Sequence, residues 1–345
     1  MKKIIINLLK LALVGGILYY LISDDRIDFK LLLLYWKHPS TLVTLVAIMS
    51  LWIVSLAALR WWLLLKAIGL EVPLKRAVLL CWIGNFFNMA LPGAVSGDFV
   101  KGYYIIRSQE KEGKTPAATT LLIDRFVGLF GLIVMAFFAL VFNLEFILEQ
   151  EKLTFFAWLV TGLFLGTVLF YTIVIFPFKE GKDPFILFFQ RLPGHKLTIK
   201  VYQAFKTYQH QKMTLVGTLL MSIVIHTSVA FMFFQIAHMI GMTELDLAAQ
   251  FFIMPLGLIV IALPIAPGGF GVGHLAFGEL YALIGISGGT DIFNLFFFVQ
   301  FSIFLLGGIP YLLYSGEYHL PKSEEEDLGP EEPDSSTSER VASRS

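Results

Sequence analysis

Two charged side chains, Asp98 and Lys101, stand three residues apart within the strongly apolar segment 85–104, NFFNMALPGAVSGDFVKGYY. On a helix this spacing puts both on one face. A carboxylate and an ammonium placed together in this way could hold a zwitterionic or phosphorylated head group, or they could form a salt bridge that only fixes the local fold. Because an aspartate in hydrocarbon costs about 2.5 to 3.5 kcal/mol, we expect Asp98 to face a polar cavity and to pair with Lys101.

Other polar residues of the same segment are candidates for the wall of this cavity. Asn85 and Asn88 share a helical face, and their amides can both donate and accept hydrogen bonds. The alternative is hydrogen bonding between helices, which is common for asparagine in membranes. Further candidates follow the asparagines along the chain, namely Pro92, Gly93, Ser96 and Gly97.

A second charged pair, Asp124 and Arg125, begins the apolar stretch in TTLLIDRFVGLF. Adjacent residues point to different sides of a helix, so we expect each to meet a different partner. Arg125 is a candidate phosphate ligand, because a guanidinium can bond two phosphate oxygens at once. For Arg60 in LRWWLLLK we favour a position at the membrane interface, beside an aromatic belt.

A second polar break lies in LPIAPGGFGVGHLAF. Its candidate cavity residues are Pro264, Pro267, Gly268, Gly269, Gly271 and His274. Glu279 follows His274 by five residues and diverges from it on a helix, which argues against a metal pair. No zinc-protease, redox, nucleophile-elbow or phosphate-loop motif occurs, so we assign no catalytic residue and expect no metal or cofactor.

The composition predicts an all-α polytopic membrane protein that would hold these residues. Of 345 residues, 57% are hydrophobic and 15% charged, and the mean hydropathy is +0.74, whereas an ordinary soluble domain is about 45 to 50% apolar. The basic N-terminus begins like a signal peptide but has no cleavage site, so we expect an uncleaved first span, with a signal peptide as the alternative. Six apolar runs are long enough to cross a bilayer: 4–22, 42–65, 121–142, 153–176, 215–240 and 292–314.

Two further apolar regions, 77–102 and 251–286, are broken by Pro and Gly. The run 77–90 is shorter than the roughly 20 residues that a spanning helix needs, so we expect each region to form a re-entrant hairpin beside a cavity. Lys and Arg favour cytoplasmic loops, and with that rule the halves 42–142 and 215–314 are inverted relative to each other. One alternative is that both breaks are Gly-Pro kinks in ordinary spans, and another is that 251–286 makes two short tilted spans.

We expect an inner-membrane protein with a transmembrane domain over 1–316, and the same rule places both termini in the cytoplasm. It places the basic loop 178–213 inside as well, although loop 24–38, with three cations, would then lie outside. The basic loop has aromatic residues at helical spacing, which fits either a helix lying on the anionic inner leaflet or a solvated connection. The acidic tail 317–345 is predicted to be disordered.

Three motifs together resemble a known family. NFFNMALPGAVSGDFVKGYY, then DRFVGLFGL, then LPIAPGGFGVGHLAF are similar to the transmembrane region of lysylphosphatidylglycerol synthases and to their stand-alone relatives, the flippase-like integral membrane proteins. The resemblance covers about residues 1–315 and implies a lipid-translocating domain with re-entrant hairpins. After residue 316 only the polar tail follows, where the synthases have an aminoacyl-transfer domain, so we expect no lysyl transfer by this chain.

The chain departs from the family pattern at two places. The first motif commonly has Gly-Gly-Asp followed by Arg, and here it is Ser96-Gly97-Asp98 with Lys101. The motif LPIAPGGFGVGHLAF commonly has Arg-Glu after its glycines in the family, and here Gly273-His274 takes that place. Recognition of an anion through a second arginine is therefore not expected.

The leading hypothesis is a membrane protein that moves or presents a polar-headed lipid, such as a phospholipid or a polyprenyl-phosphate-linked glycan. A second is a membrane transferase acting on a lipid-linked substrate, with Asp98 as base. A third is a non-catalytic subunit. We expect a lipid partner with an anionic or phosphorylated head group and no nucleic-acid partner. Two further partners are left open: a second copy of the chain, and a cytoplasmic protein bound through 178–213 or 317–345.

Overall fold

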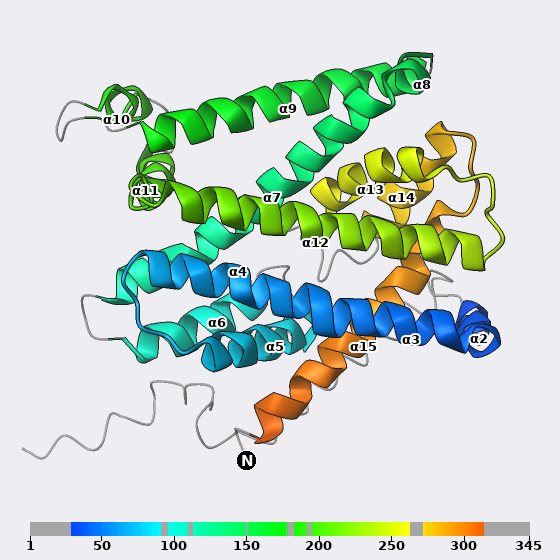
Figure 1. The fold of residues 1–345 in the computed structure, drawn as a ribbon, viewed down its shortest axis with the longest axis horizontal. Coiled ribbons are helices and arrows are strands. Elements are labelled where there is room, and N and C mark those ends of the chain that lie inside the picture. The colour runs from blue at the N-terminus through cyan, green and yellow to red at the C-terminus, as the bar shows by residue number, and fades with distance from the viewer. Residues whose placement is uncertain are drawn as a thin grey trace, which may run out of the picture.

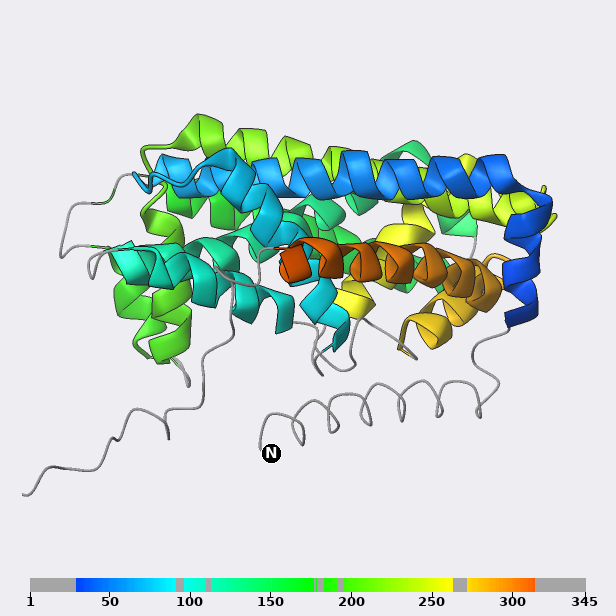
Figure 2. The same ribbon diagram turned by 90° about the horizontal axis from the view of Figure 1, so that it is seen from below.

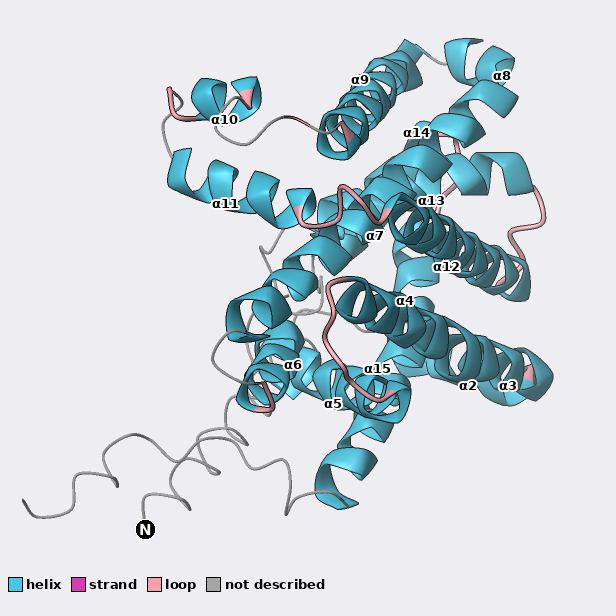
Figure 3. Ribbon diagram, turned by 60° about the vertical axis from the view of Figure 1, so that its left-hand side comes forward, coloured by secondary structure: helices cyan, strands magenta, loops and turns pink. Residues whose placement is uncertain are grey.

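A computed structural model describes residues 29–90, 96–109, 113–149, 151–176, 178, 183–191, 195–262 and 272–313 of this chain. Every regular element within these residues is a helix, so the fold is all-α, as predicted (Figure 3). The span expected at 4–22 lies outside the described residues, and so does the tail after 313.

Five helices in the described part are long and apolar enough to cross a membrane, which makes this a polytopic membrane protein. The first is a continuous helix made of α3 (Pro39–Ala47), the π-helical η1 (Ile48–Ile53) and α4 (Val54–Ala67). The others are α7 (Lys114–Phe142), α9 (Glu151–Ile175), α12 (Lys212–Met239) and α15 (Gly289–Leu313). At 1.5 Å per residue, each exceeds the roughly 30 Å of a bilayer core.

Four shorter helices form two pairs, and each pair lies along the chain between two long helices. The first pair is α5 (Leu74–Ala90, 17 residues) and α6 (Ser96–Arg107, 12 residues). The second is α13 (Leu247–Ala262, 16 residues) and α14 (Val272–Leu283, 12 residues). All four are shorter than a helix that spans a bilayer alone.

The two pairs pack in a reciprocal way. Helix α5 packs on α15, the last long helix, and α13 packs on α7, the long helix that follows the first pair (Figure 1). The α5–α15 contact depends on Gly307, because a Cβ there would collide with the carbonyl oxygen of Trp82 and lie 3.2 Å from the amide nitrogen of Phe86. Each short pair is thus held by a long helix from the other part of the chain.

Helices α4 and α12 lie side by side along one face of the bundle (Figure 2). Beneath them the core is aromatic, and Phe233 of α12 packs on Phe277 of α14 and Phe296 of α15, with ring centroids 4.8 and 4.5 Å apart. The predicted loop 24–38 contains a helix, α2 (Phe29–Lys37), whose Tyr35 hydroxyl donates to the Leu295 carbonyl at 3.0 Å.

The basic connection between α9 and α12 folds onto the bundle. It contains α10 (Pro184–Phe189) and α11 (His195–Lys206), and the short α8 (Leu144–Glu149) precedes α9. The aromatic side of α11 is covered by protein, since Tyr202 and Phe205 are each 1% exposed, and the Tyr208 hydroxyl that follows donates to the Leu64 carbonyl at 3.0 Å. The aromatic side of α11 therefore packs on the bundle, and the position of this connection on the inner leaflet stays a prediction.

Candidate functional site

The α5–α6 pair is held together by two glycines and an asparagine. A Cβ on Gly97 would collide with the carbonyl oxygen of Gly84 and lie 2.7 Å from Asn88 Oδ1. Because Gly84 and Gly97 have no Cβ, α5 and α6 approach each other closely. The Gly97 N–H can therefore donate to Asn88 Oδ1 at 2.8 Å. Asn88 therefore joins α5 to α6, which agrees with the alternative of hydrogen bonding between helices. Asn85 is half-buried on the same helix.

Asp98 lies at the start of α6 and joins two cations. Lys101 Nζ is 2.6 Å from Asp98 Oδ1, and Arg125 Nε of α7 donates to Asp98 Oδ2. The predicted pair of Asp98 with Lys101 is therefore present, and Arg125 is its second partner. The formal charges of these three residues sum to plus one.

The two cations differ in exposure. The Lys101 side chain is 13% exposed, and its Nζ lies 5.3 Å from the centre of the Trp61 ring, a cation–π distance. The Arg125 side chain is 36% exposed. Arg125 is thus the cation that an approaching group can reach, whereas Lys101 is held inside the protein.

A cleft of about 400 Å³ opens beside this cluster, between α6 and α7. Its wall is mostly apolar, and Asp98 and Arg125 are the charged residues that line it. Phe99 stands at the cleft with 75% of its surface exposed. The apolar lining residues are Phe99, Gly102, Tyr103, Ile106, Ala118, Leu121 and Leu122. The volume falls in the usual range for small-molecule sites, about 300 to 1,000 Å³.

Asp124 meets a different partner from its neighbour Arg125, as the sequence predicts. Arg60 Nε donates to Asp124 Oδ1 at 2.8 Å, and Arg60 Nη2 donates to Asp124 Oδ2 at 3.1 Å. Arg60 Nη1 also donates to Ser222 Oγ on α12 at 2.8 Å. This second ion pair joins α4, α7 and α12 inside the bundle.

The interfacial position that we favoured for Arg60 is therefore wrong. Arg60 is only 8% exposed, and the neighbouring Trp61 is fully buried and donates from Nε1 to Thr120 Oγ1 at 3.0 Å. A charge in the middle of an apolar run was the available signal for a buried pair, but the adjacent tryptophans equally suited an interface. Ser222 and Thr120 carried no sequence signal of their own.

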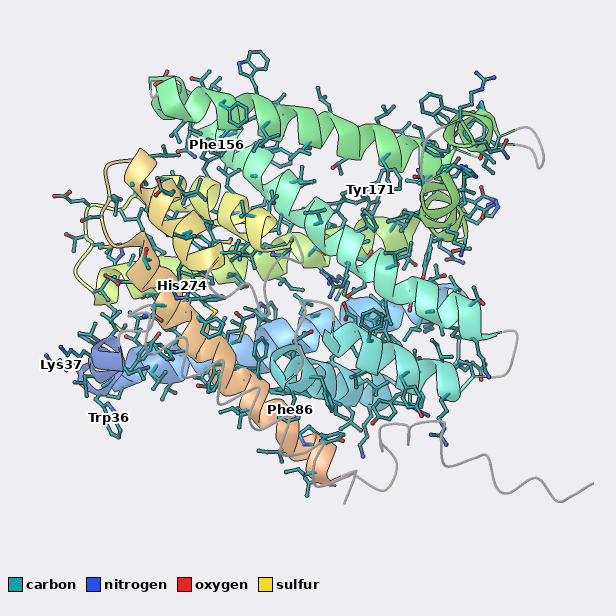
Figure 4. The ribbon with its side chains drawn as sticks, turned by 180° about the vertical axis from the view of Figure 1, so that it is seen from behind. Trp36, Lys37, Phe86, Phe156, Tyr171 and His274 are labelled. Carbon is teal, nitrogen blue, oxygen red and sulfur yellow. The ribbon has the colours of Figure 1, made fainter. Side chains whose placement is uncertain are left out.

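His274, the described candidate from the second broken region, lies away from Asp98. His274 is buried on α14, between α13 and α15, and its ring meets the Phe293 ring edge-on at 4.9 Å (Figure 4). Helix α6, by contrast, packs on α5 and α7. His274 thus does not join the Asp98 cluster. The remaining candidates of the two breaks lie outside the described residues, namely Pro92, Gly93, Pro264, Pro267, Gly268, Gly269 and Gly271.

The described residues hold no group of three His, Cys, Asp or Glu side chains close enough to bind a metal ion. The chemistry that remains is electrostatic: a partly exposed guanidinium at the polar end of an apolar cleft. Such a site suits an amphipathic molecule with an anionic or zwitterionic end.

Comparison with known proteins gives one match. The model of a family described as the lysylphosphatidylglycerol synthase TM region matches residues 7–308. No curated protein matches the chain, and no solved structure does.

Proposed function

Since the chain belongs to the family of the lysylphosphatidylglycerol synthase transmembrane region, we propose that it is a lipid translocase-like protein that moves or presents a polar-headed lipid. Membership in this family ties the chain to lipid handling in a membrane. The candidate cargo is a phospholipid or a polyprenyl-phosphate-linked glycan, whose head group would bind at Asp98, Lys101 and Arg125.

The observation that carries the proposal is the cleft between α6 and α7. Its apolar wall would receive the upper part of a lipid tail, and its charged end presents Arg125, which can bond two phosphate oxygens. The formal charge of plus one on the Asp98 cluster favours an anionic head group. Charges at membrane depth are costly, and they commonly mark a substrate path.

Transport by alternating access would follow from two inverted halves with re-entrant hairpins, which we propose for 42–142 and 215–314. The reciprocal packing of α5 on α15 and of α13 on α7 supports this proposal, as does the matching order of long and short helices. We further propose an inner-membrane location, and the distribution of Lys and Arg supports cytoplasmic termini.

Native mass spectrometry tests the site. The full-length protein is gently solubilised, delipidated in steps, and compared with Arg125→Gln and Asp98→Ala for the lipids that remain bound. We expect one defined lipid in the wild type and its loss in Arg125→Gln, where Asp98 can still pair with Lys101 at 2.6 Å and keep the local fold. Arg191→Gln is the matched control, because Arg191 is exposed and lies outside the cleft.

Movement is then tested in vesicles that contain the protein and a lipid with a labelled head group. A quencher added outside reports how much labelled lipid crosses to the outer leaflet. Slower crossing in Arg125→Gln, with Arg191→Gln unchanged, is expected. Equal lipid retention and equal crossing in all variants would refute the site, and a requirement for a divalent metal or a soluble donor would favour a membrane transferase instead.

A further inference from the structure

A second cavity, of about 490 Å³, lies between α7, α9 and α12, away from the cleft at Asp98. Its wall is mostly apolar, and its polar residues are Thr167, Tyr171, Thr172 and Lys212. The apolar part is formed by Val134, Val168, Ile175, Phe176, Val216 and Leu219. Val168, Phe176 and Val216 are 47, 55 and 45% exposed, so this cavity is open on its outer side.

The polar end of the cavity is basic. Lys212, the first residue of α12, lines it and is exposed, and among the described carboxylates none forms an ion pair with it. A second cation lies beside the same end, because Lys206 Nζ donates to the carbonyl oxygen of Phe176 at 2.5 Å. Two lysines thus stand where the apolar wall meets the basic connection 178–213.

The inner wall contains a polar group that protein leaves unsatisfied. Tyr171 of α9, which is labelled in Figure 4, is one of the lining residues, and its hydroxyl is buried without a hydrogen-bond partner among the described residues. The two threonines of the wall use their hydroxyls internally, Thr167 toward the Leu163 carbonyl at 2.9 Å and Thr172 toward the Val168 carbonyl at 2.7 Å. Because the Tyr171 hydroxyl is enclosed by protein, the charged side chain that a molecule in the cavity can reach is that of Lys212.

We propose that this cavity is a second lipid site, which binds one anionic phospholipid whose phosphate meets Lys212 and whose acyl chain lies along the apolar wall between α9 and α12. The open outer side faces the lipid, and the basic end complements an anionic leaflet. The site is independent of the proposed transport site, since it shares none of the residues of the Asp98 cluster.

The test titrates the full-length protein in detergent with phosphatidylserine or with phosphatidylcholine of the same acyl chains, and native mass spectrometry counts bound lipid. Loss of one lysine near an anionic surface weakens binding about fivefold. Lys212→Gln is therefore expected to weaken one phosphatidylserine site about fivefold and to leave phosphatidylcholine unchanged. Lys200→Gln, an exposed lysine of α11 outside the cavity, is expected to bind as the wild type does.

A second pair of variants tests the apolar wall. Val216→Trp fills the cavity and is expected to remove the site, whereas Met213→Trp, at a position that is 87% exposed and outside the wall, is expected to keep it. Excess inorganic phosphate is expected not to displace the lipid. The proposal is overturned if Lys212→Gln and Lys200→Gln bind alike, if both lipids bind equally, or if phosphate alone competes, since the last result would identify a free-anion site.

Discussion

The guanidinium of Arg60 holds both carboxylate oxygens of Asp124, with Nε 2.8 Å from Oδ1 and Nη2 3.1 Å from Oδ2. The two residues are 64 positions apart in the chain, and Ser222 of α12 takes a third guanidinium hydrogen. This pair is neutral as a unit and is shielded from the cleft, which distinguishes it from the positively charged cluster at Asp98. The chain therefore uses similar residues for two purposes: one ion pair joins helices, and the other borders a cleft.

Asp124→Asn is expected to destabilise the protein by about 3 to 5 kcal/mol, because it leaves the Arg60 charge buried without its carboxylate. Thermal unfolding in detergent measures the loss. The double variant Arg60→Met, Asp124→Leu removes both charges and is expected to recover most of the stability. A double variant as unstable as the single one would show that packing, and not charge compensation, dominates at this position.

Gly97→Ala is expected to lower the melting temperature, because the added methyl group would collide with the carbonyl oxygen of Gly84 and force α5 and α6 apart. Overpacking of this kind costs about 1 to 3 kcal/mol. Gly162→Ala on α9 is the control, since a Cβ there meets nothing within 4 Å, and alanine favours a helix. Equal melting temperatures for the two variants would contradict the close α5–α6 approach.

Lys101→Met is expected to reduce stability more than Arg125→Gln does. Lys101 is nearly enclosed between Asp98 and the Trp61 ring, whereas the Arg125 side chain is 36% exposed and can be replaced at lower cost. With Arg125 as the main ligand, Arg125→Gln is expected to lose more bound lipid than Lys101→Met does. Measuring melting temperature and bound lipid on the same samples separates the two roles, and parallel changes in both would count against this division.

Tyr202→Phe is expected to loosen α10 from α11, because the Tyr202 hydroxyl donates to Asp183 Oδ2 at 2.7 Å. Burial, and then the hydrogen bond and the charge of Asp183, raise the pKa of Tyr202 above its ordinary value near 10. The folded state therefore favours the protonated phenol, so this contact is intact below about pH 10 and is lost as the pH rises through the raised pKa. Hydrogen exchange of the backbone amides of residues 185–189 measures this loosening.

The same exchange experiment supplies its control. The Phe185 N–H donates to Asp183 Oδ1 at 3.0 Å. This hydrogen bond does not involve Tyr202, so it is expected to remain in Tyr202→Phe. The wild type is expected to exchange faster at high pH, beyond the chemical increase that an unfolded peptide shows. The variant is expected to lack this extra step, and an identical extra step in both proteins would assign it to another group.

Apolar length predicted most of the helical framework. The runs 153–176 and 215–240 match α9 and α12 within three residues at each end, because a helix satisfies all its backbone groups inside a membrane and needs only enough apolar residues to cross it. Helix α7 begins seven residues before the run 121–142, since its first two turns are polar and lie beyond what hydropathy detects. The short pairs were predictable from their Pro and Gly breaks, although the re-entrant path remains a proposal.

Some contacts of the candidate site were predictable from the sequence, and others depend on how the helices pack. The sequence by itself determined the pair of Asp98 with Lys101, because three residues on a helix bring side chains together wherever that helix lies. Only the tertiary structure decided that Arg125, 27 positions away, is the second partner of Asp98, that Arg60 pairs with Asp124, and that Lys212 and Tyr171 border one cavity. Such contacts depend on which helices pack together, and that is a property of whole helix surfaces and not of local periodicity.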